Sequence, residues 1–445
     1  MVDLSVEIGG LAFKNPIMMA AIAPCGPWTH WPAEKDAPEI QMKMWRKLYE
    51  AGLGGICTGL IFPFDDPELD KGGGRFWAAR TKGFAKREGF ISAASIPDAG
   101  LSKSNSLEAI RRAKKEFTDV RIIANIITTG TDPKVWGNLA LECQQAGADM
   151  VEMNFGSAMI FDNVATAQRG IEYKEDLPAG ITIGLVPEIA SSIVKGMKKI
   201  TDIPVVVKLT PELSFFHLTR AVPMYRDAGI IGFTANHCFM SVVPPDIYNG
   251  GKTTFPQMET TTWWTTNGPW HRFACYRNVA MLGKYFPDMS VLACGGLVTP
   301  EQCVEIMMLG ARGVQLSAGV FWNGLSYTGK VVNFLKTYME EQGYDSVNDF
   351  IGLGQQYIVE MEDCQREFKS QIGKLIAQID REKCVGLSTC KRCLDNWCFA
   401  TYVENDQPMV DAGLCSSCNL CVITCPHGAR SLQWAGDSEG SRQKG

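Results

Sequence analysis

The feature that most constrains this chain is a run of cysteines near its C-terminal end. The run is Cys415-Ser-Ser-Cys418-Asn-Leu-Cys421-Val-Ile-Thr-Cys425-Pro426, which has the spacing C-x2-C-x2-C-x3-C-P. Thiolates at this spacing bind a [4Fe–4S] cluster, and in two-cluster modules the fourth cysteine ligates the neighbouring cluster. Paired C-x2-C segments also bind zinc, but a zinc ribbon uses two separated pairs. The spacing therefore favours iron and sulfur and indicates transfer of single electrons.

A second, less regular set of four cysteines lies just upstream, with spacings of x5, x2 and x4. Since two-cluster modules exchange their fourth ligands, the sequence predicts two [4Fe–4S] clusters. One would be bound by Cys384, Cys390, Cys393 and Cys425, and the other by Cys415, Cys418, Cys421 and Cys398.

Composition excludes several classes of protein. The chain has 445 residues, of which 46% are hydrophobic and 20% charged, with a net charge of −5 and no basic stripe, so nucleic acid is not an expected partner. No apolar run has the length of a membrane span, and the first residues lack a secretory signal. Sixteen cysteines without an export signal indicate a reducing cytoplasm. Exposed clusters would also favour an anaerobic metabolism.

Upstream of the cysteines, short apolar β-rich runs alternate with amphipathic helical segments. The expected helices include Leu107–Glu116, Trp136–Ala146, Val186–Ile200, Leu218–Ala228, Phe273–Tyr285 and Glu301–Leu309. The expected strands are Ile17–Ala21, Gly55–Thr58, Arg121–Ile127, Met150–Asn154, Pro204–Leu209, Ile231–Ala235, Ser290–Cys294 and Gly313–Leu316.

Eight such units predict a (β/α)8 TIM barrel, an α/β fold, followed by a small α+β domain like the bacterial ferredoxins. A doubly wound sheet is the alternative, but no G-x-G-x-x-G follows any strand. We place the barrel at residues 1–343, a helical connector at 344–379, the two-cluster domain at 380–436 and a flexible tail at 437–445.

Polar side chains follow several expected strands, at the end where TIM barrels carry their active sites. They are Thr58, Asn125, Asn154, Lys208 and Asn236. A lone asparagine at such a place is more often a capping residue, but several polar groups on one rim favour a site. Gly295-Gly296 and Ser317 follow the seventh and eighth strands, where this fold often binds phosphate.

Two long insertions interrupt the barrel pattern, Pro63–Asn105 and Cys238–Trp270. The second carries Trp263, Trp264 and Trp270, and His271 follows it. Indole rings above a barrel mouth can stack on a planar ligand. They can equally pack the insertion onto the barrel or form a subunit interface, and the sequence leaves these alternatives open.

Taken together, the chain resembles the flavin-dependent dihydroorotate and dihydropyrimidine dehydrogenases, above all those that join an FMN barrel to a two-cluster ferredoxin domain. The matching segments run in order along nearly the whole chain. They are Phe13-Lys-Asn-Pro16, Ala20-Ala21, Ala51-Gly-Leu-Gly54, Glu152-Met-Asn154, Val207-Lys-Leu-Thr-Pro211, Thr234-Ala-Asn236, Gly268 with Arg272 and Arg277, Ala293-Cys-Gly-Gly296 and Val314-Gln-Leu-Ser-Ala318.

The resemblance implies FMN, with Lys208 near the pyrimidine edge of the flavin. FMN binding is also implied for Ala20, Ala21, Thr58, Asn125, Asn236, Gly295, Gly296, Ser317 and Ala318. It further implies a substrate stacked on the flavin, for which we expect contacts from Asn154, Asn236 and Trp270.

Several residues depart from the family pattern. Ser157 stands where the family has a catalytic cysteine, Gly59 where members carry a lysine, and His237 where they carry a threonine. Ser92 takes the place of a substrate-binding asparagine. Candidate proton donors are therefore Ser157, His237, His271 and Cys25, in that order, and a histidine donor would titrate in the ordinary imidazole range.

We expect an oxidoreductase acting on CH–CH groups, with electrons relayed through the clusters to FMN. It would reduce, or reversibly oxidise, a carbon–carbon double bond in a planar cyclic substrate larger than uracil. The expected partner is an NAD(P)H reductase subunit or a ferredoxin, and the expected assembly a homodimer or larger complex. The alternatives are a dihydropyrimidine or dihydroorotate dehydrogenase proper, or an electron-transfer flavoprotein subunit. The sequence names neither the substrate nor the direction.

Overall fold

The computed structural model describes residues 2–21, 36–66, 76–80, 90–94, 100–157, 180–254, 259, 264–371, 373–393 and 398–435. The chain divides into two compact units, Met1–Gln355 and Gln356–Gly445. Within the described residues, no helix combines the length and apolar character needed to cross a membrane.

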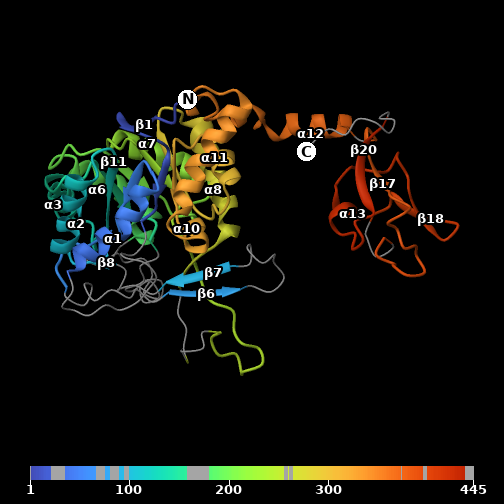
Figure 1. The fold of residues 1–445 in the computed structure, drawn as a ribbon, viewed down its shortest axis with the longest axis horizontal. Helices are drawn as coiled ribbons and strands as arrows, with labels where there is room; N and C mark the ends of the chain where they lie inside the picture. The colour runs from blue at the N-terminus through green and yellow to red at the C-terminus, as the bar shows by residue number, and fades with distance from the viewer. Residues whose placement is uncertain are drawn as a thin grey trace. The chain divides into compact units, whose positions relative to one another are not determined.

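The first unit is a closed barrel of eight parallel strands surrounded by helices, so the predicted TIM barrel is confirmed (Figure 1). The strand order is β3-β4-β9-β10-β11-β12-β15-β16, and β16 pairs with β3 to close the ring. The strands are β3 (Ile17–Met19), β4 (Gly55–Cys57), β9 (Arg121–Ile126), β10 (Met150–Asn154), β11 (Val205–Lys208), β12 (Gly232–Ala235), β15 (Ser290–Cys294) and β16 (Gly313–Leu316).

Each of these strands coincides with an expected one, because parallel barrel strands are covered on both faces and appear as unbroken apolar runs. All residues of β10, β11, β12, β15 and β16 are buried. Two further short strands, β5 (Leu60–Ile61) and β8 (Gly100–Leu101), extend the sheet beside β9.

Helices surround the barrel, and both ends of each expected helix lie within four residues of their predicted positions. Helix α9 shows why such segments begin where they do: Thr299 caps it in a capping box with Gln302, and Pro300 occupies the first turn. The helices of the first unit are α1 (Ala37–Glu50), α2 (Lys103–Glu116), α3 (Pro133–Ala146), α5 (Ile181–Gly184), α6 (Pro187–Met197), α7 (Phe215–Asp227), α8 (Arg272–Tyr285), α9 (Pro300–Met308), α10 (Ala318–Asn323) and α11 (Tyr327–Gln342), with 3-10 turns η2 (Pro269–His271), η3 (Val347–Asp349) and η4 (Leu353–Tyr357).

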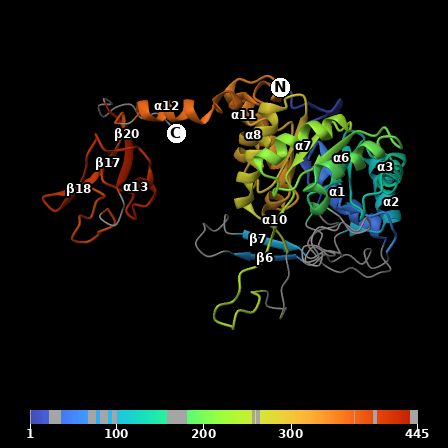
Figure 2. The ribbon, with the colours of Figure 1, turned by 180° about the vertical axis from the view of Figure 1, so that it is seen from behind.

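The two ends of the barrel are covered differently. A hairpin of β1 (Val6–Ile8) and β2 (Leu11–Phe13) lies at the amino end of the strands, where the Gly9 N–H donates to Ser290 Oγ at 3.0 Å. The opposite end carries an antiparallel sheet in the order β13-β14-β7-β6. Its strands are β6 (Phe76–Arg80), β7 (Phe90–Ala94), β13 (Phe239–Ser241) and β14 (Trp264–Asn267). Figures 1 and 2 show its strands β6 and β7.

This antiparallel sheet joins the two long insertions, which the sequence presents as separate loops. Strand β7 belongs to the insertion after β4, and β14 to the insertion after β12, and they pair with Ser92 opposite Asn267. The insertions are therefore one structural element at the carboxyl end of the barrel.

The second unit begins with α12 (Met361–Gln371) and continues as a small α+β domain. Two antiparallel pairs form its frame, β17 (Leu375–Ile379) with β20 (Arg430–Trp434), and β18 (Thr401–Glu404) with β19 (Gln407–Val410). The short helix α13 (Leu420–Ile423) lies inside the cysteine run. A ferredoxin-like C-terminal region is thus confirmed.

Candidate active site and cluster sites

The polar residues expected at the strand ends all lie at the carboxyl end of the barrel, because parallel strands end on the same side. Asn125 is near the end of β9, and Asn154 and Lys208 are the last residues of β10 and β11. The others directly follow β3, β4, β12, β15 and β16; they are Ala20, Ala21, Thr58, Asn236, Gly295, Gly296, Ser317 and Ala318.

A carboxylate to which the sequence analysis gave no role, that of Glu152, lies near this end. Glu152, in the middle of β10, is fully buried and forms an ion pair with Lys208, whose Nζ lies 3.1 Å from Oε1. Donors from five other strands converge on the same carboxylate. They are Cys57 Sγ (3.4 Å), Asn125 Nδ2 (2.6 Å), Lys208 Nζ (3.1 Å), Thr234 Oγ1 (2.5 Å) and Gln315 Nε2 (2.7 Å).

Glu152 and Lys208 each stabilise the ionised form of the other. Burial raises the pKa of the Glu152 carboxyl, but Lys208 and the hydrogen bonds from Thr234 and Gln315 outweigh burial and hold the pKa below its ordinary value. Burial likewise lowers the pKa of Lys208, yet the surrounding side chains, Cys294 and Glu152 among them, raise it above its ordinary value. Both groups are therefore ionised at neutral pH.

An amide chain links this carboxylate to the turn that bears Ser157. Asn125 donates to Glu152, and its Oδ1 accepts from Asn154 Nδ2 at 3.1 Å. The Oδ1 of Asn154 in turn accepts from the Ser157 N–H at 2.9 Å. The side chains of Asn125 and Asn154 are thus engaged within the protein, and their predicted roles toward flavin and substrate stay predictions.

Thr58, Ala20 and the glycines also have partners in the protein. Thr58 Oγ1 accepts from the Asn125 N–H at 3.0 Å, and the Ala20 N–H donates to the Leu316 carbonyl at 3.0 Å. Gly296 has a φ of +71°, and a Cβ there would lie 2.5 Å from the Arg272 nitrogen. The close packing of this turn therefore requires glycine at position 296, whether or not it also contacts a phosphate.

Five buried polar atoms around this end lack a hydrogen-bond partner among the described residues. They are Ser157 Oγ, Asn236 Nδ2, His237 Nδ1, Trp270 Nε1 and His271 Nε2. Buried polar atoms are nearly always paired, so such a group makes this end of the barrel a candidate binding site. With the Lys208 ammonium at the same end of the barrel, these donors and acceptors fit the heteroatoms of an isoalloxazine ring and a polar planar substrate.

The two histidines are neutral in this environment. Burial lowers the pKa of His271 to about 4. Burial, with the nearby Lys208 and His271, holds the pKa of His237 well below its ordinary value. Burial therefore favours the neutral imidazole at both positions, which differs from the expectation that a histidine donor would titrate in the ordinary imidazole range.

Trp270 and His271 belong to an aromatic group at the edge of the insertion sheet. The rings of Trp270 and Phe239 stack with centroids 5.5 Å apart, and His271 lies 4.9 Å from Phe239. One face of the Trp270 ring is thus covered by the insertion, which agrees with a packing role for this indole. Cys25 and Trp263 lie outside the described residues, and the side chain of Trp264 is not described.

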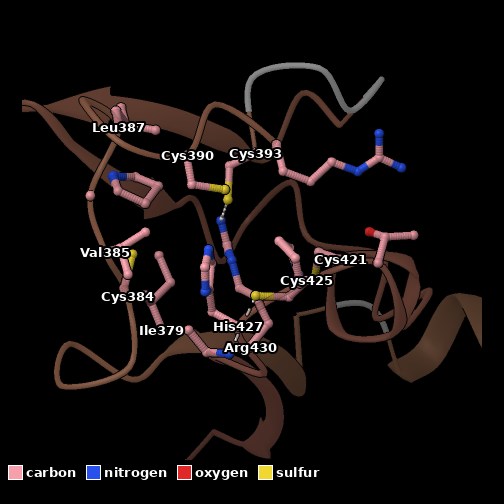
Figure 3. Close-up of a pocket in the computed structure, with 16 residues that line it drawn as sticks. Ile379, Cys384, Val385, Leu387, Cys390, Cys393, Cys421, Cys425, His427 and Arg430 are labelled. Carbon is pink, nitrogen blue, oxygen red and sulfur yellow. Dashed lines mark hydrogen bonds between the residues drawn. The ribbon is translucent and has the colours of Figure 1, made fainter.

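In the second unit, cysteines of both sets meet at one small pocket. Cys390 and Cys393 lie side by side there, with Cys384 and Cys425 on other walls (Figure 3). Cys421 also lines the pocket. Its sulfurs include the four expected to bind one cluster, with Cys425 coming from the downstream run. No three His, Cys, Asp or Glu side chains of the described residues are grouped to bind a single metal ion.

A buried arginine accompanies these thiols. Arg430, at the start of β20, is 5% exposed and donates through Nη2 to Cys393 Sγ at 3.1 Å, as the dashed line in Figure 3 shows. Its other terminal nitrogen, Nη1, has no partner among the described residues. A buried guanidinium can offset part of the negative charge of a thiolate-bound cluster, so the donor set fits an iron–sulfur cluster.

The remaining four cysteines form the second group. Cys415 is buried with Ala377 and Ala400, and Cys398 and Cys421 pack against them. Burial raises the pKa of the Cys421 thiol, and the proximity of Cys418, Cys398 and Cys415 adds to the rise. Cys398, from the upstream set, is therefore brought to the downstream cysteines.

Comparisons with known proteins agree with both units. Residues 408–431 match a family described as a 4Fe-4S binding domain. The chain is 25% identical over 402 residues to the NAD-dependent dihydropyrimidine dehydrogenase subunit PreA of Escherichia coli, covering 88% of this chain and 84% of that protein. It is 24% identical over 358 residues to the catalytic subunit of dihydroorotate dehydrogenase B (NAD(+)) of Pyrococcus furiosus, covering 79% and 99%. A chloroplastic dihydropyrimidine dehydrogenase (NADP(+)) of Arabidopsis thaliana is 23% identical over 382 residues, covering 83% and 81%.

Proposed function

We propose that this homologue of the dihydropyrimidine and dihydroorotate dehydrogenases is an FMN- and iron–sulfur-dependent oxidoreductase acting on a CH–CH bond of a planar cyclic substrate. The observation that carries the proposal is the group of unpartnered buried polar atoms around the Lys208 ammonium at the barrel mouth. FMN, when bound, would exchange two electrons with the substrate and single electrons with the clusters.

Different residues of the chain would bind the flavin, orient the substrate and supply the proton. Lys208 would face the edge of the flavin that gains negative charge on reduction, where an ammonium stabilises it. Asn236 and Trp270 carry unpartnered donors that would orient the substrate. Ser157 is the first candidate for the proton donor, because it stands at the family's cysteine position and its Oγ has no partner among the described atoms.

Dihydropyrimidine or dihydroorotate dehydrogenase activity proper is the second candidate, and it rests on the printed names of the relatives. Gly59 and Ser157 argue for a different substrate, since they replace a lysine and a cysteine of the family pattern. We propose that an NAD(P)H reductase subunit or a ferredoxin exchanges electrons with the clusters, in a homodimer or larger complex in the cytoplasm. A subunit that only relays electrons is the third alternative.

Substrate turnover by the isolated chain tests the proposal. Dithionite-reduced protein, freed of excess reductant under argon, is mixed with uracil, thymine, orotate and larger unsaturated ring compounds, and the flavin absorbance is followed. We expect reoxidation by one of the larger rings without any partner protein. If only pyrimidines reoxidise the flavin, the second candidate holds; if only a ferredoxin does, the chain is an electron-transfer subunit.

Cofactor analysis tests the cluster assignment. The purified protein should contain about eight iron atoms and one FMN, as two [4Fe–4S] clusters and one flavin require. Because the fourth ligands are exchanged, Cys425→Ser should remove the same paramagnetic signal as Cys393→Ser, and Cys398→Ser the same signal as Cys418→Ser. About four irons accompanied by zinc would restrict the cluster to the downstream run.

A further inference from the structure

The buried carboxylate of Glu152 has no role assigned from the sequence, although it accepts more hydrogen bonds than any neighbouring side chain at the barrel mouth. We propose that Glu152 is a positioning residue, which fixes the Lys208 ammonium and the turn bearing Ser157 in one hydrogen-bonded unit. The inference rests on the proposed function, since the ligand that Lys208 meets is FMN.

The geometry of the carboxylate carries the first part of the proposal. Each oxygen has its own set of donors: Oε1 accepts from Lys208, Asn125 and Cys57, and Oε2 accepts from Thr234 and Gln315. Gln315 also accepts from Lys208 Nζ, at 3.4 Å. Two acceptors on different strands therefore hold the ammonium, which restricts the directions in which its remaining proton can point.

Glu152 is the counter-charge of Lys208, because the other titratable groups that face the ammonium are neutral at neutral pH. These groups are Cys57 on β4, Cys294 on β15, and His237 and Cys238 after β12. Burial raises the pKa of each of the three thiols, and it holds the pKa of His237 well below its ordinary value, so all four groups are neutral at neutral pH. Cys294 raises the pKa of Lys208 only at a pH high enough to form its thiolate. Within the described residues, Glu152 is thus the ionised acid in contact with Lys208.

The amide chain of Asn125 and Asn154 supports the second part of the proposal, that Glu152 positions the turn bearing Ser157. Asn125 and Asn154 each use both ends of the side-chain amide, so neither can rotate without breaking a bond at each end. The position of Ser157 is therefore set from the same carboxylate that sets the position of Lys208. Buried polar networks in which every member is paired are rigid.

The test is the pH dependence of FMN affinity in a Glu152→Gln variant. The substitution keeps the size of the side chain and removes its charge, so the buried Lys208 loses its counter-ion and deprotonates at a lower pH. Between about pH 7.5 and 9, above the second ionisation of a phosphate, the FMN dissociation constant of the wild type should stay nearly constant. In the variant it should rise by about tenfold for each pH unit above the new lysine pKa.

Two further variants serve as controls. Asp149→Asn removes a carboxylate that pairs with Lys114 and Arg121 at the opposite end of β10, and it should lower stability without changing the pH profile. Glu152→Asp keeps the charge and should bind FMN more weakly but independently of pH, and it carries the test if Glu152→Gln does not fold. A pH profile of Glu152→Gln parallel to the wild type, or a pH-dependent profile of Glu152→Asp, would overturn the proposal. Failure of the wild type to bind FMN would instead reject the proposed function.

Discussion

Replacing Lys208 with methionine should leave the purified protein nearly free of FMN while its cluster iron stays at the wild-type level. The ammonium offsets the negative charge of the reduced flavin, and methionine keeps the apolar part of the side chain without the charge. The cysteines lie in the other compact unit, Gln356–Gly445, so their iron should not respond. Flavin and iron are measured on the same sample, by absorbance and by elemental analysis.

Loss of FMN must be separated from loss of the barrel. Lys208→Met alone leaves the buried Glu152 carboxylate without its counter-ion. Removing one partner of a buried ion pair lowers the free energy of unfolding by about 3–5 kcal/mol. The double variant Lys208→Met with Glu152→Gln removes both charges and should recover most of the stability but not the flavin. A folded single variant with full flavin content would contradict the assignment of Lys208.

Replacing Ser157 with alanine should lower turnover by about 10²–10⁴-fold, the usual range for a positioned acid or base. FMN content and reduction through the clusters should not change, because the Ser157 hydroxyl has no partner among the described residues and its loss breaks no contact of the barrel. The measurement is single-turnover reoxidation of the reduced flavin by the substrate.

His237 and His271 are the alternative proton donors with which Ser157 is compared. Since burial lowers the pKa of His271 to about 4, an imidazolium donor would be present only below that pH and would be lost as the pH rises through it. The wild-type rate should therefore show no imidazole titration between about pH 6 and 8. A full rate in Ser157→Ala together with a severe loss in His237→Gln or His271→Gln would move the donor to a histidine.

The barrel was predictable because its strands are short and buried on both faces, so each leaves a compact apolar run in the sequence. Lys208 and Asn154 were predictable for the same reason, since a polar residue that ends such a run lies on the rim. The place of Glu152 was not predicted, because the five donors that define it come from strands spread over residues 57–315. Its signal was a charged residue inside a strand otherwise free of charge, which is rare in buried segments.

The cysteine spacing indicated how many thiols would gather, but not what would accompany them. Arg430 lies five residues after Cys425, and the sequence gives no sign that its guanidinium is buried against Cys393. That contact depends on the pairing of β20 with β17, which begins at the Arg430–Ile379 pair. Local spacing thus specifies ligands, while tertiary pairing specifies the groups around them.

The sheet shared by the two insertions has a consequence for how this end of the barrel can vary. Residues 90–94 and 264–267 form adjacent strands, so each insertion provides the strand that pairs with a strand of the other insertion. Grafting one loop from a relative would leave an unpaired edge on the other. Variation at these two places should therefore be correlated, and an exchange of loops has to replace both segments together.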